Sequence, residues 1–196
     1  MTENFGNSLP EPLRITLLIT KEFEKMHINY FIGGSLASAI HGTIRATMDA
    51  DIIADISIQD VDLFIKDLQE EFFIDEVSIH DAIVARICFN LIHKKTMFKI
   101  DVFPWKSEPF ESSQMERKVF FKLSSSDDDS AYFASAEDIL LAKINWYRLG
   151  GEISDRQWSD IRGIIRVQEF TLDYEYLRYW ANQLSLTCLL EKALQA

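Results

Sequence analysis

The sequence predicts an α+β fold, in which a mixed β-sheet flanked by helices is followed by a C-terminal helical part. Hydrophobic residues make up 47% of the 196 residues, which is enough for a substantial core. Strand-like and helix-like patterns alternate as far as the Ser/Asp-rich stretch 124–131, and only helical patterns follow it. We therefore predict an α/β core over residues 1–130 and a helical region over 131–196 that packs on it.

Each element of the first part has a recognisable pattern. Residues 10–28 read as an amphipathic helix with proline at its start, and 29–34 as a short strand that ends in glycines. Residues 35–42 form a small-residue helix with Ser35 as its N-cap and Gly42 as its stop. Further helices are predicted over 57–72 and 80–86, and further strands over 48–56, 87–93, 97–104 and 118–123.

Four helices are predicted after the Ser/Asp-rich stretch. They span 135–149, 154–168, 172–184 and 186–194, and Ser135 and Ser154 are expected to cap the first two. The tryptophans at 146, 158 and 180 have apolar neighbours, so we expect them to pack in the core.

Composition narrows the functional classes. The net charge of −11 gives no broad positive field, so no long nucleic-acid footprint is expected. No apolar segment is long enough to cross a bilayer, and the first residues do not resemble a secretory signal. Cys88 and Cys188 fit neither a metal-binding spacing nor a disulfide framework. These features predict a cytoplasmic protein without a membrane partner.

Three aspartates indicate a metal site. Asp49 and Asp51 alternate along one predicted strand, so both side chains point to the same face. Asp101 lies between Ile100 and Val102 in another strand, where a carboxylate needs a partner. Because neighbouring carboxylates repel one another, we expect a divalent cation, Mg²⁺ or Mn²⁺, to bind all three. Such a group can serve in-line nucleotidyl transfer.

A glycine-rich turn precedes these acids. Gly33 and Gly34 follow a predicted strand and allow a ligand to approach the backbone closely. Ser35 opens the next helix, whose first N–H groups favour an anion. We therefore expect the turn to bind the phosphates of a nucleotide.

The remaining polar residues have two interpretations each. Arg45 either neutralises the acids or reaches phosphate, and Lys143 either extends along an apolar surface to solvent or reaches the β- or γ-phosphate. His41 is expected to be a packed or capping histidine rather than a contact to the substrate. Arg156 and Asp160 are four residues apart and predict a helical surface pair.

Gly34-Ser35, Asp49-x-Asp51 and the later Asp101 together resemble the nucleotidyltransferase superfamily typified by DNA polymerase β. The string "GGSLASAIHGTIRATMDADI" is more particular, because it is similar to small bacterial nucleotidyltransferases related to AbiEii-type abortive-infection toxins. Leu140 with Lys143 and Arg156 with Asp160 match further spacings of that group, whereas Trp146 replaces an alanine and no aspartate follows Asp160 until Asp173. The resemblance covers roughly residues 28–165.

The resemblance implies a nucleotidyltransferase-type sheet, nucleotide binding at Gly34 and Ser35, metal binding at Asp49 and Asp51, and a third carboxylate at Asp101. We accordingly predict transfer of a nucleoside monophosphate from an NTP to an unknown acceptor, which is a small molecule, a protein or an RNA end. The alternatives are a catalytically silent nucleotide- or partner-binding module, and an AbiEii-like toxin component acting on tRNA or protein. An antitoxin-like protein is a further candidate partner.

Overall fold

The computed structural model describes residues 9–126 and 128–195, in two compact units. The first unit comprises Met1–Phe31, Met48–Trp105 and Phe120–Tyr132, and the second Ile32–Thr47, Lys106–Val119 and Phe133–Ala196. Each unit thus combines segments that are distant in the sequence. The predicted division into 1–130 and 131–196 follows the chain linearly and stays a prediction.

One seven-stranded sheet has the order β3-β4-β5-β2-β1-β7-β6. Its strands are β1 (Tyr30–Ile32), β2 (Asp49–Ala54), β3 (Phe72–Phe73), β4 (Phe89–His93), β5 (Lys99–Pro104), β6 (Val119–Lys122) and β7 (Ser130–Phe133). The β2–β5 and β1–β7 pairs are parallel, whereas β3–β4 and β4–β5 are antiparallel. The sheet is therefore mixed, and with its helices it confirms the predicted α+β class.

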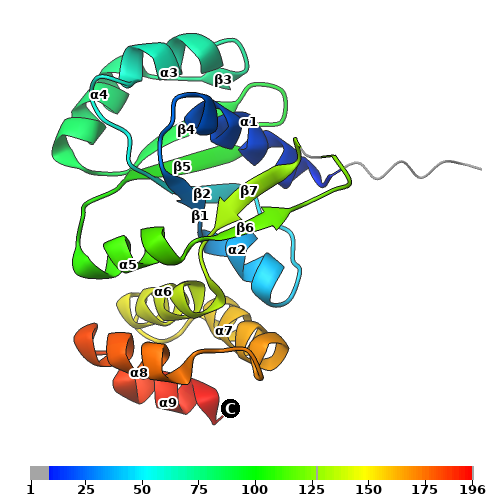
Figure 1. Ribbon diagram of the computed structural model, residues 1–196, viewed down its shortest axis with the longest axis vertical. Helices are drawn as coiled ribbons and strands as arrows, with labels where there is room; N and C mark the ends of the chain where they lie inside the picture. Colours follow the sequence, from blue (N-terminus) through cyan, green and yellow to red (C-terminus); the bar gives the residue numbers. More distant parts are fainter. Residues whose placement is uncertain (1–8, 127, 196) are drawn as a thin grey trace, which may run out of the picture. The chain divides into compact units, whose positions relative to one another are not determined.

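The first unit contains helices α1 (Glu11–Lys25), α3 (Val61–Leu68) and α4 (Glu76–Ala85), seen in the blue to green part of Figure 1. The rings of Phe23 from α1 and Phe64 from α3 stack with centroids 5.2 Å apart, and both side chains are fully buried. β2 and β5 alternate between buried and half-buried residues along their length. The strands therefore bury one face, with Ile52 and Val102 on it, and leave the other face partly accessible.

The second unit is helical apart from its share of β1, β6 and β7. It contains α2 (Gly34–His41), α5 (Pro109–Arg117), α6 (Ala136–Leu149), α7 (Asp155–Gln168), α8 (Tyr174–Gln183) and α9 (Thr187–Leu194). Helices α6 to α9 pack on one another, as the yellow to red part of Figure 1 shows, and α2 packs on α6 and α7. No helix in the described ranges combines the length and apolarity needed to cross a bilayer.

Several predicted elements are confirmed. Ser135 and Ser154 cap α6 and α7, each accepting a hydrogen bond from a backbone N–H three residues later. The strands β2, β4, β5 and β6 lie within their predicted ranges.

Other local predictions are wrong. The N-cap of α2 is Gly33, and Ser35 lies inside the helix. Helix α4 begins at Glu76 rather than at His80, because the Asp75 side chain caps it by accepting from the Ser78 N–H. Helix α5 and the strands β3 and β7 were not predicted from the sequence.

The tryptophan prediction fails at one position. Trp146 is 59% exposed, although it was expected in the core. Trp158 and Trp180 are half-buried and have aromatic neighbours, Tyr147 at 5.0 Å and Phe110 at 5.1 Å between ring centroids.

Candidate functional site

The first unit places the predicted metal ligands on two neighbouring strands. In the parallel pair of β2 and β5, Asp51 is the register partner of Asp101, and Asp49 that of Lys99. Residues two apart in a strand share a face, and register partners of adjacent strands share it too. The three aspartates therefore lie on the same, half-buried face of the sheet.

A lysine that was not singled out from the sequence shares this face. The Nζ atom of Lys99 lies 2.6 Å from Oδ2 of Asp101. The hydrogen bond to Asp101 is the main reason that the pKa of Lys99 is raised, and the charges of Asp49 and Asp51 raise it further. Lys99 thus offsets part of the negative charge that the three carboxylates create. Its position two residues before Asp101 in a strand was the available sequence signal.

The thiol of Cys88 is influenced by the negative charge of the same aspartates. Burial of its sulfur, followed by the charges of Asp101 and Asp51, raises the pKa of the Cys88 thiol to about 11. Although part of the residue is exposed, the thiol stays protonated at neutral pH and is a poor nucleophile.

The donor set of the aspartate face fits a divalent cation that prefers oxygen. Three carboxylates on adjacent positions of one face supply oxygen ligands of the kind that Mg²⁺ and Mn²⁺ bind. Lys99 occupies Oδ2 of Asp101 and would compete with a metal ion for that oxygen, whereas Asp101 has a second carboxylate oxygen, Oδ1.

The second unit joins the other predicted site residues in one largely buried network. Arg45 donates from Nε to Oδ1 of Asp160 at 2.9 Å and from Nη2 to Oδ2 at 3.0 Å, which makes the pair bidentate. Arg45 Nη2 also donates to Oγ of Ser35 at 2.6 Å. Lys143 Nζ donates to Oδ2 of Asp160 at 2.8 Å. The loop after α2, helix α2 itself, helix α6 and helix α7 are thus connected through this network.

Burial and charge distinguish this network from surface ion pairs. Lys143 is 4% exposed and Asp160 is 7% exposed, so the interpretation that Lys143 extends to solvent is wrong. Burial by itself raises the pKa of Asp160, but hydrogen bonds from Arg45 and Lys143 outweigh it and hold the pKa below its usual value. With two cations and one anion the network is net positive, which suits an anionic ligand.

The predicted helical pair of Arg156 with Asp160 is wrong as well. Asp160 turns into the unit and pairs with Arg45 and Lys143, while Arg156 is exposed. Arg45 pairs with Asp160 from a position 115 residues away in the chain, which no local spacing indicated.

Close backbone packing positions the network. A Cβ atom on Gly42 would lie 2.9 Å from the backbone nitrogen of Ile164, and one on Gly163 would lie 2.9 Å from Oγ1 of Thr43. The end of α2 therefore lies directly against α7, one turn after Asp160. His41, buried as predicted, fixes this end through a 2.8 Å hydrogen bond from Nε2 to the carbonyl of Ala134.

The glycine-rich turn has the conformation that its sequence favours. Gly34 has φ of +53°, a left-handed value that side chains disfavour, and it begins α2 directly after β1. The first N–H groups of a helix have no partner within it, and Ser35 sits among them with its hydroxyl oriented by Arg45. The turn and the network are thus one connected group within the second unit.

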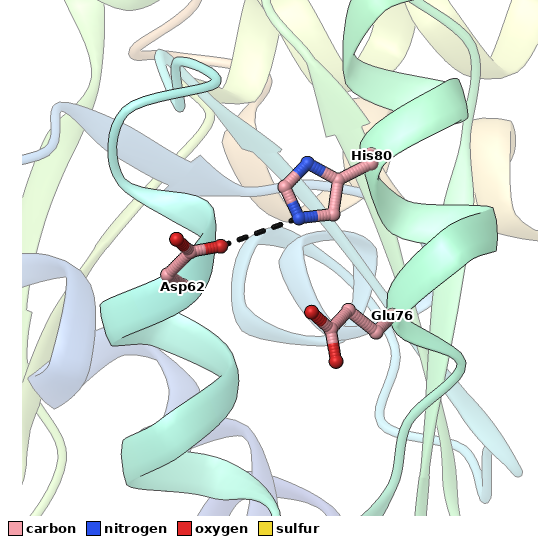
Figure 2. A group of neighbouring side chains, drawn as sticks. All are labelled: Asp62, Glu76 and His80. Atoms are coloured by element: carbon pink, nitrogen blue, oxygen red, sulfur yellow. Dashed lines mark ion pairs between the residues drawn. The ribbon is translucent and has the colours of Figure 1, made fainter.

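A second set of metal-ligand side chains occurs in the first unit, on helices α3 and α4 rather than on β2 and β5. Asp62 of α3 and Glu76 and His80 of α4 have ligating atoms that all lie within 4.8 Å of one another. Figure 2 shows these side chains facing the space between the two helices.

Comparison with known proteins identifies the fold. The structure is similar to that of an antigenic nucleotidyltransferase-like protein from Paracoccidioides brasiliensis, with a TM-score of 0.59 and 18% identity over 95% of this chain and 93% of that one. The chain has a nucleotidyltransferase fold.

Two antibiotic-modifying proteins share this fold. ANT(2″)-Ia in complex with adenylyl-2″-tobramycin has a TM-score of 0.57 and 11% identity, with 88% of this chain and 96% of that chain covered. The lincomycin-bound lincosamide adenylyltransferase LnuA has a TM-score of 0.51 and 15% identity, with 81% and 98% covered. No protein-family model and no curated protein matches the sequence.

Proposed function

We propose that this chain is a divalent-metal-dependent nucleotidyltransferase, which moves a nucleoside monophosphate from an NTP to a hydroxyl group. The observation that carries the proposal is the register of Asp51 beside Asp101, with Asp49 on the same face of the sheet. Three neighbouring carboxylates repel one another and destabilise the fold unless a cation binds them. The nucleotidyltransferase fold supports the proposal independently.

In this proposal Asp49, Asp51 and Asp101 hold Mg²⁺ or Mn²⁺, which would neutralise charge on the transferred phosphoryl group. The acceptor oxygen forms a bond to the α-phosphorus, and the bond from that phosphorus to the bridging oxygen of pyrophosphate breaks. Asp101 accepts the proton of the acceptor hydroxyl, and pyrophosphate leaves with the electron pair.

We assign the triphosphate to the glycine-rich turn and the network of Arg45, Lys143 and Asp160. Gly33, Gly34 and Ser35 offer backbone N–H groups, and Arg45 and Lys143 offer positive charge. Asp160 engages both cations in the structure, so its role is to hold them in position. Phosphate oxygens then accept from Arg45, whose guanidinium has five N–H donors of which Asp160 takes two, and lie within the positive field of Lys143.

For the acceptor we favour a small hydroxyl-bearing molecule. The similar LnuA and ANT(2″)-Ia structures hold an antibiotic and an adenylylated antibiotic respectively. The net charge of −11 disfavours a polyanionic RNA end and suits a cationic acceptor. A protein or tRNA acceptor, the relation to AbiEii-type toxins and an antitoxin-like partner stay predictions.

A catalytically silent nucleotide-binding module is the second candidate. Two contacts favour it: Lys99 occupies the Asp101 carboxylate, and Asp160 pairs with both candidate phosphate-binding cations. A silent module would bind NTP and never release pyrophosphate.

Binding and turnover distinguish the two candidates. The melting temperature is measured with each NTP in the presence and absence of Mg²⁺, since a ligand that binds only the native state raises it. Transfer is then assayed with α-labelled NTPs against a panel of aminoglycosides, lincosamides, tRNA and cell-extract proteins. Nucleotide-dependent stabilisation with no labelled acceptor and no pyrophosphate would support the silent module.

A matched pair of variants tests the metal site. The double variant Asp49→Asn/Asp51→Asn should lose the Mg²⁺-dependent part of the stabilisation and all transfer. Asp55→Asn is the control, because Asp55 follows the same strand and is exposed. If the double variant keeps the full Mg²⁺-dependent shift, the aspartates do not bind the metal.

A further inference from the structure

Three side chains with different ligand chemistry converge between α3 and α4 in the first unit. Asp62 and Glu76 contribute carboxylate oxygens and His80 an imidazole nitrogen, and their ligating atoms lie within 4.8 Å of one another. His80 Nε2 already lies 3.3 Å from Oδ1 of Asp62, as the dashed line in Figure 2 shows. The proposed nucleotidyl transfer does not use any of them.

The two helices hold these residues in place. Glu76 and His80 are four residues apart in α4, so they lie one above the other on the same side of the helix. Asp62 stands in the first turn of α3. Both helices are anchored by fully or nearly fully buried apolar residues, which are Phe64 and Leu68 in α3 and Ile79 and Ala82 in α4. The ligands therefore project from rigid elements rather than from loops.

Their spacing suits one small metal ion. With metal–ligand bonds of about 2.0–2.2 Å, two ligand atoms on one metal are at most about 4.4 Å apart. The ligating atoms lie within 4.8 Å of one another, so only a small side-chain movement is needed to bring all three onto one metal ion. The Asp62 side chain is 85% exposed and has the room to make this movement.

The ligand types select the metal. One imidazole with two carboxylates matches the ligands of zinc, whereas Mg²⁺ prefers oxygen ligands and keeps several waters. Three protein ligands leave at least one position for water or for a group from another molecule.

We infer that Asp62, Glu76 and His80 form a binding site for a divalent transition-metal ion, best matched by Zn²⁺, which joins α3 to α4. The site does not depend on the proposed nucleotidyltransferase activity. It is distinct from the aspartates of β2 and β5, because its ligands come from helices and include a nitrogen donor.

The test is a titration of the chelator-treated protein with ZnCl₂. Calorimetry measures the binding, and the melting temperature is determined with and without the ion. We expect one equivalent of Zn²⁺ to bind with a dissociation constant in the micromolar range or tighter and to raise the melting temperature. Co²⁺ should replace it and give visible absorption bands of low coordination number. Millimolar Mg²⁺ should not displace either ion.

Variants assign the ligands. His80→Ala and Glu76→Gln should each weaken Zn²⁺ binding at least tenfold and abolish the Co²⁺ bands. His27→Asn is the matched control, since His27 is exposed and its φ of +58° is one that asparagine tolerates. Asp49→Asn/Asp51→Asn should bind Zn²⁺ like the wild type. The inference is overturned if the wild type binds no Zn²⁺, or if His80→Ala binds it as well as His27→Asn does.

Discussion

Lys143 and Asp160 form an ion pair at 2.8 Å, and less than a tenth of either residue is exposed. The Asp160 carboxylate also receives both hydrogen bonds of the Arg45 fork, so two cations share it. The loop after α2, helix α6 and helix α7 are thereby tied at a single side chain. This pairing explains why three residues that are far apart in sequence act as one group.

Removing the shared carboxylate should be the most damaging change in this network. Asp160→Asn leaves two cations without their counter-charge, and we expect the free energy of unfolding to fall by about 3–5 kcal/mol. Lys143→Met leaves the Arg45–Asp160 pair intact and keeps the apolar stem, so we expect the free energy of unfolding to fall by only about 1–3 kcal/mol. Urea unfolding of both variants measures the difference. Equal losses would show that Arg45 alone does not compensate the buried charge of Asp160 when Lys143 is absent.

The Lys143→Met variant also separates the structural role of Lys143 from a role in binding. If Lys143 contacts phosphate, this variant should bind NTP about tenfold more weakly or worse, since a hydrogen bond to a charged group contributes roughly 1.5–3 kcal/mol. Arg156→Met, an exposed change on α7, is the control. Calorimetric titration with NTP and Mg²⁺ provides the measurement. Wild-type affinity in Lys143→Met would limit the lysine to holding Asp160.

Mild acid should destabilise the protein through His41. Burial lowers the pKa of His41 in the folded state. Because the unfolded chain then binds a proton more readily than the folded one, stability is fully present above the unfolded pKa of about 6.5 and falls as the pH decreases below it. The melting temperature between pH 8 and pH 5 measures this loss. His41→Gln, which can still donate to Ala134, should flatten that dependence, and an unchanged slope would assign the effect to other groups.

Two glycines should respond differently to the same substitution. Gly42→Ala brings a methyl group within 2.9 Å of the Ile164 backbone, which cannot rotate away, so a loss of about 1–3 kcal/mol is expected. Gly163→Ala meets the Thr43 side chain instead. Adding Thr43→Ala should therefore restore part of the stability of Gly163→Ala and none of that of Gly42→Ala. Chemical denaturation of the single and double variants checks this, and absence of rescue would show that the Thr43 side chain is not what Gly163→Ala encounters.

Metal binding at the aspartates should change the reactivity of Cys88. With its pKa raised to about 11, roughly one thiol in a thousand is ionised at pH 8. Mg²⁺ or Mn²⁺ bound to Asp51 and Asp101 would offset their charges, lower that pKa and accelerate alkylation. The rate is measured in a Cys188→Ser background, and Asp49→Asn/Asp51→Asn should remove the acceleration. A rate indifferent to metal would count against binding beside Cys88.

The sequence alone determined the elements whose evidence is local. Alternation places Asp49 and Asp51 on one face of β2, and serine followed by acidic residues marks the start of α6, because both features depend on neighbours within a few residues. The α+β class followed from the same periodicities. The short strands β3 and β7 were not predicted, because two or four residues are too few to show an alternating pattern. The strand β7 also depends on pairing with β1, which lies about a hundred residues earlier in the chain.

The tertiary structure alone decided which partners the charged residues take. Local spacing favoured Arg156 for Asp160, yet Asp160 is buried, where its charge requires strong compensation, and the folded chain supplies Arg45 and Lys143. The pairing of Lys99 with Asp101 and the meeting of Asp62 with His80 likewise depend on how strands and helices pack. Periodicity specifies the face on which a side chain lies, whereas long-range packing and the energy of burying charge specify what that side chain meets.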